Sequence, residues 1–190
     1  MTHMETARVF AAVQFAAQEK REIAEVSEAL RPLVAAGRLS RPELLHITLH
    51  FFGETPRGRF ADIARAMEGA AARHRPFRME TSAPGMFGGA GGVLWLGVGQ
   101  GAAELLALQA DLEKELIQQG FPVENRPFRA HITLGREVRL KPGARLADVN
   151  LPPVNLTVES LALMESTRVS GRLAYVPLFS AELGHGSRLR

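Results

Sequence analysis

The sequence predicts an α+β fold of two pseudo-symmetric lobes, each a small, mostly antiparallel sheet with helices on the outside, around a central cleft. The tetrapeptide His-Ile-Thr-Leu occurs at residues 46–49 and again at 131–134, an offset of 85 residues. At the same offset, Arg8–Val13 aligns on Val93–Val98. Both aligned segments precede a helical pattern, a short polar loop and the motif strand, so the chain reads as two copies of one unit.

The first unit opens with a β-branched and aromatic strand, in which Phe10 aligns on Trp95 of the second unit. A helical apolar spacing follows, and Pro32 and Gly37 should bend or end that helix. Thr55 is expected to cap the next helix, with Pro56 in its first turn. The expected elements are a strand over Val9–Phe15, a helix over Gln18–Ala36, the motif strand over Leu44–Phe52, a helix from Thr55 to about His74 and a short strand over Phe77–Ser82.

The second unit follows a glycine-rich loop over Pro84–Gly92, which lacks the Gly-Lys-Ser/Thr ending of a phosphate-binding P-loop and precedes no helix. We expect a hairpin or a flexible loop at the cleft edge there. A turn is expected around Ser170 and Gly171. The remaining elements are a strand over Val93–Val98, a helix over Ala102–Gln119 stopped by Gly120, a loop over Phe121–Arg129, the motif strand over Ala130–Leu134, an irregular or partly helical stretch over Val138–Pro153, and strands over Leu156–Leu163 and Tyr175–Leu183.

Composition predicts one soluble bilobal domain over 1–190, with lobes at about 1–84 and 92–184 and a frayed tail at 185–190. The sequence shows no apolar run of membrane-spanning length and no signal-peptide pattern. Cysteine is absent, which excludes disulfides, cysteine zinc sites and thiol catalysis. We therefore expect a cytoplasmic monomer. The net charge of +3, with 20 arginines and 3 lysines, permits an anionic substrate without requiring one.

The repeated motif presents its polar side chains on one side of a strand. Residues two apart on a strand share a face, so His46 and Thr48 point one way and the intervening apolar residue the other; His131 and Thr133 repeat this. Histidine both accepts and donates protons near neutrality. In-line attack at phosphorus needs a base and an acid on opposite sides, and threonine hydroxyls can donate to the nonbridging oxygens. The motif pair thus predicts acid–base chemistry at a phosphate.

The histidines have two alternative roles, structural or metal-binding, and the place of His50 bears on the second. Each of His46 and His131 could be structural, hydrogen-bonded at a strand end. Regular alternation places His50 on the face of His46, where we expect it at the cleft edge or the surface. A metal held by these three histidines is the rival use of the cluster, although no carboxylate shares their face and the helical His-Glu-x-x-His spacing is missing. We expect neither a metal nor a cofactor.

The two signature segments resemble those of the two-histidine (2H) phosphoesterases. The segments are Leu45–Gly53 and Glu124–Leu134, and the resemblance runs from Arg8 through Leu163–Ser166 to Tyr175. The branch it most resembles is the bacterial and archaeal RNA 2′,3′-cyclic phosphodiesterase, long called 2′-5′ RNA ligase. This resemblance implies metal-independent hydrolysis of a 2′,3′-cyclic phosphate to a 2′-phosphate.

The resemblance also implies site residues. His46 and His131 would be the acid and base, and Thr48 and Thr133 the phosphate donors.

An arginine tends to follow the second motif in this family, which here is Arg136. It would face away on a regular strand, unless Gly135 permits a bulge. Arg129 has the right parity, and a surface role remains open for both arginines. The tryptophan that usually precedes the first motif is missing at Arg38–Ser40, and Phe128 could stack a base or pack in the core.

We therefore expect an enzyme that acts on RNA ends or short oligonucleotides with a 2′,3′-cyclic phosphate, with His131 activating water and His46 protonating the 3′ oxygen. Either order suits a nearly symmetric site. Reversible 2′-5′ ligation in the same site is an alternative, because microscopic reversibility makes it available. A non-catalytic RNA- or phosphate-binding module is another, although binding alone would not need paired titrating groups. The oligomeric state and the natural RNA are not given by the sequence.

Overall fold

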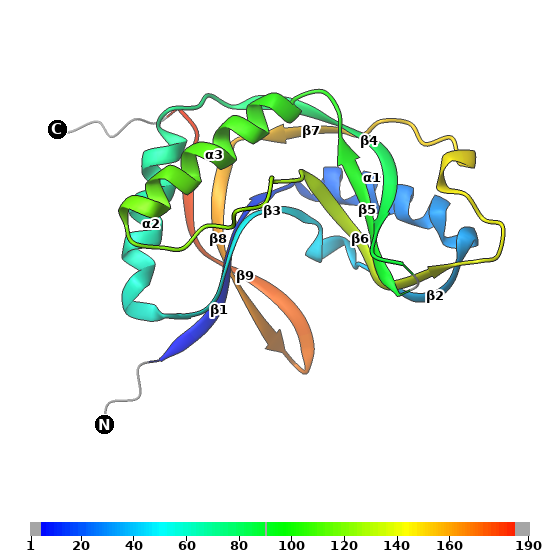
Figure 1. The fold of residues 1–190 in the computed structure, drawn as a ribbon, viewed down its shortest axis with the longest axis horizontal. Coiled ribbons are helices and arrows are strands. Elements are labelled where there is room, and N and C mark those ends of the chain that lie inside the picture. The colour runs from blue at the N-terminus through cyan, green and yellow to red at the C-terminus, as the bar shows by residue number, and fades with distance from the viewer. Residues whose placement is uncertain (1–4, 90, 185–190) are drawn as a thin grey trace.

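A computed structural model describes residues 5–89 and 91–184, which form two antiparallel sheets and three α-helices (Figure 1). The α+β class is confirmed. The first sheet has the strand order β3 (His46–Pro56), β1 (Thr6–Gln14), β8 (Ser160–Val169) and β9 (Arg172–Glu182). The second sheet has the order β2 (Val34–Leu39), β6 (His131–Leu140), β5 (Gly92–Val98), β4 (Phe77–Phe87) and β7 (Asn155–Val158).

The two sheets share a pattern that follows the sequence repeat. In the first sheet β1 lies between its motif strand β3 and β8, and in the second β5 lies between its motif strand β6 and β4. However, β8 and β9 come from the second half of the chain, and β2 and β4 from the first. Neither sheet therefore consists of strands from only one of the sequence halves, 1–84 or 92–184.

The helices cover the sheets and supply one apolar core. Helix α2 (Phe60–Ala71) packs on α3 (Ala102–Gln118) and on β8 and β9 of the first sheet. Helix α1 (Ala17–Leu30) reaches the second sheet, where the Glu19 carboxylate accepts the Thr157 N–H of β7 at 2.7 Å. Within the described residues, none of the helices is long and apolar enough to span a lipid bilayer.

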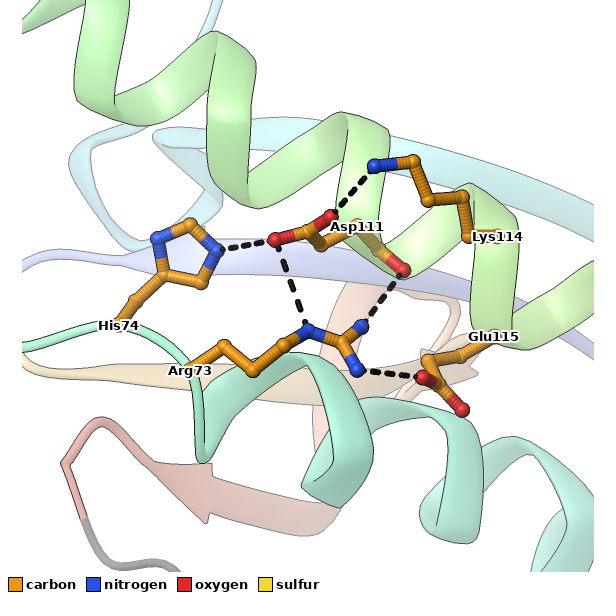
Figure 2. Close-up of polar contacts among 5 residues, drawn as sticks. All are labelled: Arg73, His74, Asp111, Lys114 and Glu115. Carbon is orange, nitrogen blue, oxygen red and sulfur yellow. Dashed lines mark hydrogen bonds and ion pairs between the residues drawn. The ribbon is translucent and has the colours of Figure 1, made fainter.

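Charged side chains connect the end of α2 to α3 (Figure 2). Asp111 pairs with His74 at 3.0 Å and with Lys114 at 2.9 Å, and Arg73 pairs with Glu115 at 2.7 Å. The cations Arg73 and Lys114 are exposed, and ion pairs made by solvent-exposed cations contribute at most about 1 kcal/mol each. We therefore assign this cluster to the orientation of the two helices, while the apolar contacts provide most of the stability.

The predicted helix over Gln18–Ala36 was too long. The α-helix ends at Leu30, a 3-10 turn holds Pro32, and the chain then forms β2, which the sequence did not predict. Pro32 lacks the N–H that an α-helix needs. Gly37 is not a helix stop but a strand residue with φ of 115°, at which a Cβ would lie 2.6 Å from the Glu137 carbonyl oxygen of β6.

The predicted helix start at Thr55 was also wrong. Thr55 and Pro56 belong to β3, and α2 begins at Phe60 after a 3-10 turn over Arg57–Arg59. The Thr55 hydroxyl donates to the Gly53 carbonyl at 3.2 Å instead of capping a helix. Pairing with β1 continues to the end of β3, so the β ladder outweighs the local capping signal.

Three further boundaries differ from the prediction. Strand β4 continues through the expected loop as far as Phe87, so the β4–β5 hairpin is confirmed with a shorter turn. Strand β6 extends to Leu140. The single strand expected over Leu156–Leu163 is two strands, β7 and β8, in different sheets. The third helix and the turn at Ser170 and Gly171 are confirmed, whereas the tail at 185–190 lies outside the described residues.

Candidate functional site

Both motif strands carry a β-bulge at the equivalent residue. In β3, Thr48 pairs with Ala12 and His50 with Ala11, which leaves Leu49 as an extra residue. In β6, Thr133 pairs with Trp95 and Gly135 with Leu94, which leaves Leu134 extra. Before each bulge the histidine and threonine share one face, which we call the histidine face of each sheet; after it the alternation is reversed.

His46 lies half-buried between two aromatic rings. Phe10 of β1 and Tyr175 of β9 lie 4.9 Å and 5.1 Å from the His46 ring, centroid to centroid. The Nδ1 atom is 2.7 Å from the carbonyl oxygen of Leu44, and Nε2 is 2.9 Å from the hydroxyl of Thr48. A carbonyl only accepts, so Nδ1 carries a proton, and in the neutral ring Nε2 accepts from Thr48.

His131 repeats the backbone contact in a more open environment. Its Nδ1 donates to the carbonyl of Arg129, two residues earlier, at 2.6 Å. The Phe87 ring stands edge-on at 5.0 Å and is itself stacked on Trp95 at 5.1 Å. The same carbonyl, at position i−2, therefore orients the ring in both halves and leaves Nε2 as the atom available for proton transfer.

The environment of His46 lowers its pKa to about 4. Burial is the largest cause, because the charged imidazolium loses its hydration. The positive charges of Lys20, Arg136 and His131 lower it further, and the hydrogen bond to Leu44 opposes them. Strands β3 and β6, which carry the two histidines, contact each other although they belong to different sheets (Figure 1).

His50 does not share the face of His46, contrary to the prediction. The bulge at Leu49 turns it toward the core, where it is 8% exposed and its ring lies 4.6 Å from Phe52. Burial lowers the pKa of His50 as well. The bulge therefore separates His50 from His46, with which it would have to bind a metal in the alternative three-histidine site. Among the described residues, no group of three or more histidine, aspartate or glutamate side chains has a metal-binding arrangement.

The second bulge has the opposite consequence for Arg136. Gly135 pairs with Leu94 on the core face, so the following residue turns to the histidine face, as the predicted bulge requires. Arg136 is exposed, and its charge acts on His46. A Cβ at position 135 would lie 2.9 Å from Val138 Cγ2 and 3.0 Å from the Arg38 carbonyl, so glycine suits this bulge.

The other two predicted binding residues have different surroundings. Arg129 is exposed, with its guanidinium 5.9 Å from the Phe87 ring centroid, so it lies beside the His131 ring pair. Phe128 packs against the main apolar core and is half-buried. This contact favours its structural role over base stacking.

Several residues beside the histidines were not predicted as site residues. The rings of Phe10, Tyr175 and Phe87 contact them, and Trp95 stacks on Phe87. The signals in the sequence were the alignment of Phe10 on Trp95 in the repeat and the place of Tyr175 in the resemblance. Lys20 on α1 donates to the Gln14 side chain at 3.1 Å, and Gln14 pairs directly with His46 in the β1–β3 register. Burial lowers the pKa of Lys20. The approach of α1 to β3 depends on tertiary packing and leaves no local pattern.

Comparisons with known proteins show the family to which the chain is similar. The family described as the 2′-5′ RNA ligase superfamily matches residues 16–170. A protein of Geobacillus stearothermophilus named RNA 2′,3′-cyclic phosphodiesterase is 32% identical over 136 residues, which cover 70% of this chain but only 43% of that protein. A Thermotoga maritima protein of the same name is 27% identical over 184 residues, covering 94% of this chain and 97% of that protein.

Solved structures share the whole architecture. Escherichia coli LigT in its apo form is 28% identical with a TM-score of 0.75, and the match covers 94% of this chain and 98% of that one. LigT complexed with 3′-AMP gives a TM-score of 0.74 at 28% identity, over 94% of this chain and 99% of that one. The overall fold is therefore common to these proteins.

Proposed function

This chain belongs to the 2′-5′ RNA ligase superfamily, and on that premise we propose that it hydrolyses RNA or nucleotide 2′,3′-cyclic phosphates to 2′-phosphates, with His46 and His131 as an acid–base pair. One observation carries the proposal: two equivalent strands present a histidine and a threonine on one face, and the carbonyl at i−2 orients both rings alike. The relatives named RNA 2′,3′-cyclic phosphodiesterase support the reaction.

The surroundings of the two rings favour a role assignment opposite to the one expected from the sequence. His46 is half-buried and neutral at pH 7, and its Nε2 lone pair faces the Thr48 hydroxyl, so it takes the proton of water once that hydroxyl turns to the phosphate. His131 is more open. In the proposed step a water oxygen attacks phosphorus, its proton passes to His46, the P–O3′ bond breaks, and the proton of His131 passes to O3′. The 2′ ester remains.

The phosphate needs donors for its nonbridging oxygens. Thr48 and Thr133 stand two residues from the histidines on the same face; Thr133 supplies one donor, and Thr48 supplies a second when its hydroxyl turns from His46 Nε2 to the phosphate. The guanidinium of Arg136 supplies a charge-assisted donor on that face. Arg129, beside Phe87, is the second candidate for the phosphate or the adjoining ribose. Such fixed donors stabilise the negative charge that grows as water attacks.

A product assay with excess chelator tests reaction, regiochemistry and metal requirement together. Adenosine 2′,3′-cyclic phosphate is incubated with the enzyme, and 2′-AMP and 3′-AMP are separated chromatographically. We expect 2′-AMP at an undiminished rate. A 3′-AMP product would contradict the assigned leaving oxygen, and loss of activity with chelator would contradict the metal-independent mechanism. Tight RNA binding without any turnover would indicate a binding module instead.

Ligation is the second candidate function, favoured by the description of the family itself. The reverse of the proposed step joins a 5′-hydroxyl RNA to a cyclic phosphate with the same acid and base. Water at about 55 M competes with the RNA hydroxyl, so hydrolysis should dominate in dilute solution. Incubating both RNA ends together and looking for a 2′-5′ product separates the two activities.

A further inference from the structure

A cavity of about 220 Å³ opens next to His46, between the β8–β9 hairpin and the segment that leads into β3. Its size suits part of a nucleotide better than a whole drug-sized ligand. Leu44 and Tyr175 line both the cavity and the environment of His46: the first through its carbonyl bond to Nδ1, the second through its ring. The cavity therefore adjoins the residues that contact His46.

The walls of the cavity combine apolar surface with arginines. Val169 and Leu173 are 55% and 38% exposed, although both are apolar. Together with the Tyr175 ring they offer a surface on which a planar base can lie, and exposed apolar side chains that gather at a cavity indicate a binding surface. Arg41 and Arg172 stand at its edge.

The two arginines differ in what they already bind. Arg41 pairs with Glu43 at 3.0 Å and donates to the Leu173 carbonyl, so it braces the hairpin against the segment before His46. Arg172 is exposed, and no ion pair involving it occurs among residues 5–89 and 91–184. An unneutralised guanidinium beside apolar surface suits one backbone phosphate of a single RNA strand.

We propose that this cavity is a subsite for the penultimate nucleotide of an RNA, the one that precedes the nucleotide carrying the cyclic phosphate. Its base would lie on Tyr175, Val169 and Leu173, and the phosphodiester that follows it would contact Arg172. The inference rests on the proposed function and narrows its substrate class to RNA of two or more nucleotides. A mononucleotide does not fill the cavity and makes none of these contacts. The enzyme therefore prefers RNA of two or more nucleotides to a cyclic mononucleotide.

The test compares kcat/KM for adenosine 2′,3′-cyclic phosphate with that for the dinucleotide ApA carrying a 2′,3′-cyclic phosphate. We expect at least a tenfold preference for the dinucleotide. A dinucleotide with an uncharged methylphosphonate linkage should lose most of it, because the contact to Arg172 needs the anionic phosphate. Arg172→Ala should reduce the preference to about twofold, and Arg172→Lys should retain part of it. The control Arg65→Ala removes an exposed charge from α2 and should leave the preference unchanged.

The outcomes separate the subsite from the reaction. Turnover of both substrates with equal kcat/KM, or a preference that Arg172→Ala leaves intact, would overturn the subsite while the proposed function stands. If neither substrate is turned over, both the proposed function and the subsite are overturned. A full preference for the methylphosphonate dinucleotide would overturn the role of Arg172.

Discussion

The two halves of the molecule share a backbone device but not a chemical environment. In each, a strand delivers His-Ile-Thr-Leu, the i−2 carbonyl holds the imidazole, and a bulge follows the threonine at the equivalent leucine. In the first half the histidine is enclosed by Phe10 and Tyr175, whereas in the second it meets Phe87 edge-on and is more open. Near-symmetric strands therefore place one histidine in an enclosed environment, where burial lowers the pKa of His46, and the other in a more open one.

The residues after the bulges extend this difference. The bulge in β6 turns the charged Arg136 to the histidine face, while the equivalent residue in β3 is Phe51, which pairs with Phe10 and lies beneath the Arg8 guanidinium at 5.0 Å. An exposed arginine thus stands in one half and an aromatic ring in the other. The two halves therefore share the backbone geometry of the motif and differ in the side chains around it.

The largest expected effect comes from removing either imidazole. His46→Ala and His131→Ala should each lower the rate on a nucleoside 2′,3′-cyclic phosphate by about 10²- to 10⁴-fold, because each loses one proton-transfer partner. A substrate with sulfur in place of O3′ separates the roles, since a thiolate leaves without protonation. His131→Ala should lose much less on that substrate and His46→Ala the same as before. Equal losses for both variants would contradict the assignment, and full activity in both would remove the mechanism altogether.

The motif strands could be predicted from the sequence because a tetrapeptide repeated in register fixes which side chains share a face. The bulges could not: regular alternation puts His50 beside His46 and turns Arg136 away, and a single extra residue in each strand reverses both. Gly135 gave a hint on one side, whereas Leu49 gave none. Tyr175 and Lys20 reach His46 from distant segments, so their place depends on tertiary packing that no local pattern records.

The next largest effect on the rate comes from Arg136, which follows the bulge in β6. Arg136→Ala should lower kcat/KM by about 10- to 100-fold, as expected for loss of one charge-assisted hydrogen bond to the phosphate. Arg136→Lys should recover part of this loss, because it keeps the charge without the planar fork. Arg139→Ala, an exposed arginine further along β6, is the matched control. Steady-state kinetics at two salt concentrations check the charge dependence; an Arg136→Ala enzyme with unchanged kcat/KM would exclude the phosphate contact.

The third effect is on stability and not on rate, and it belongs to the first half. The folded-state pKa of His46, about 4, lies below the value of about 6.5 expected for an unfolded chain. The unfolded state therefore binds a proton first as the pH falls, and the folded protein loses stability between pH 6.5 and pH 4, by about 3 kcal/mol from this group when the change is complete. His50, whose pKa is also lowered, contributes with the same sign. The free energy of unfolding in urea should fall less steeply with pH over this interval for His46→Asn than for the unsubstituted protein. The fall that remains in the variant is assigned to His50 and to the carboxylates. If the free energy of unfolding falls with pH in parallel for the two proteins, the His46 ring is solvated. Burial would then not keep His46 neutral, and its role as the base would lack support.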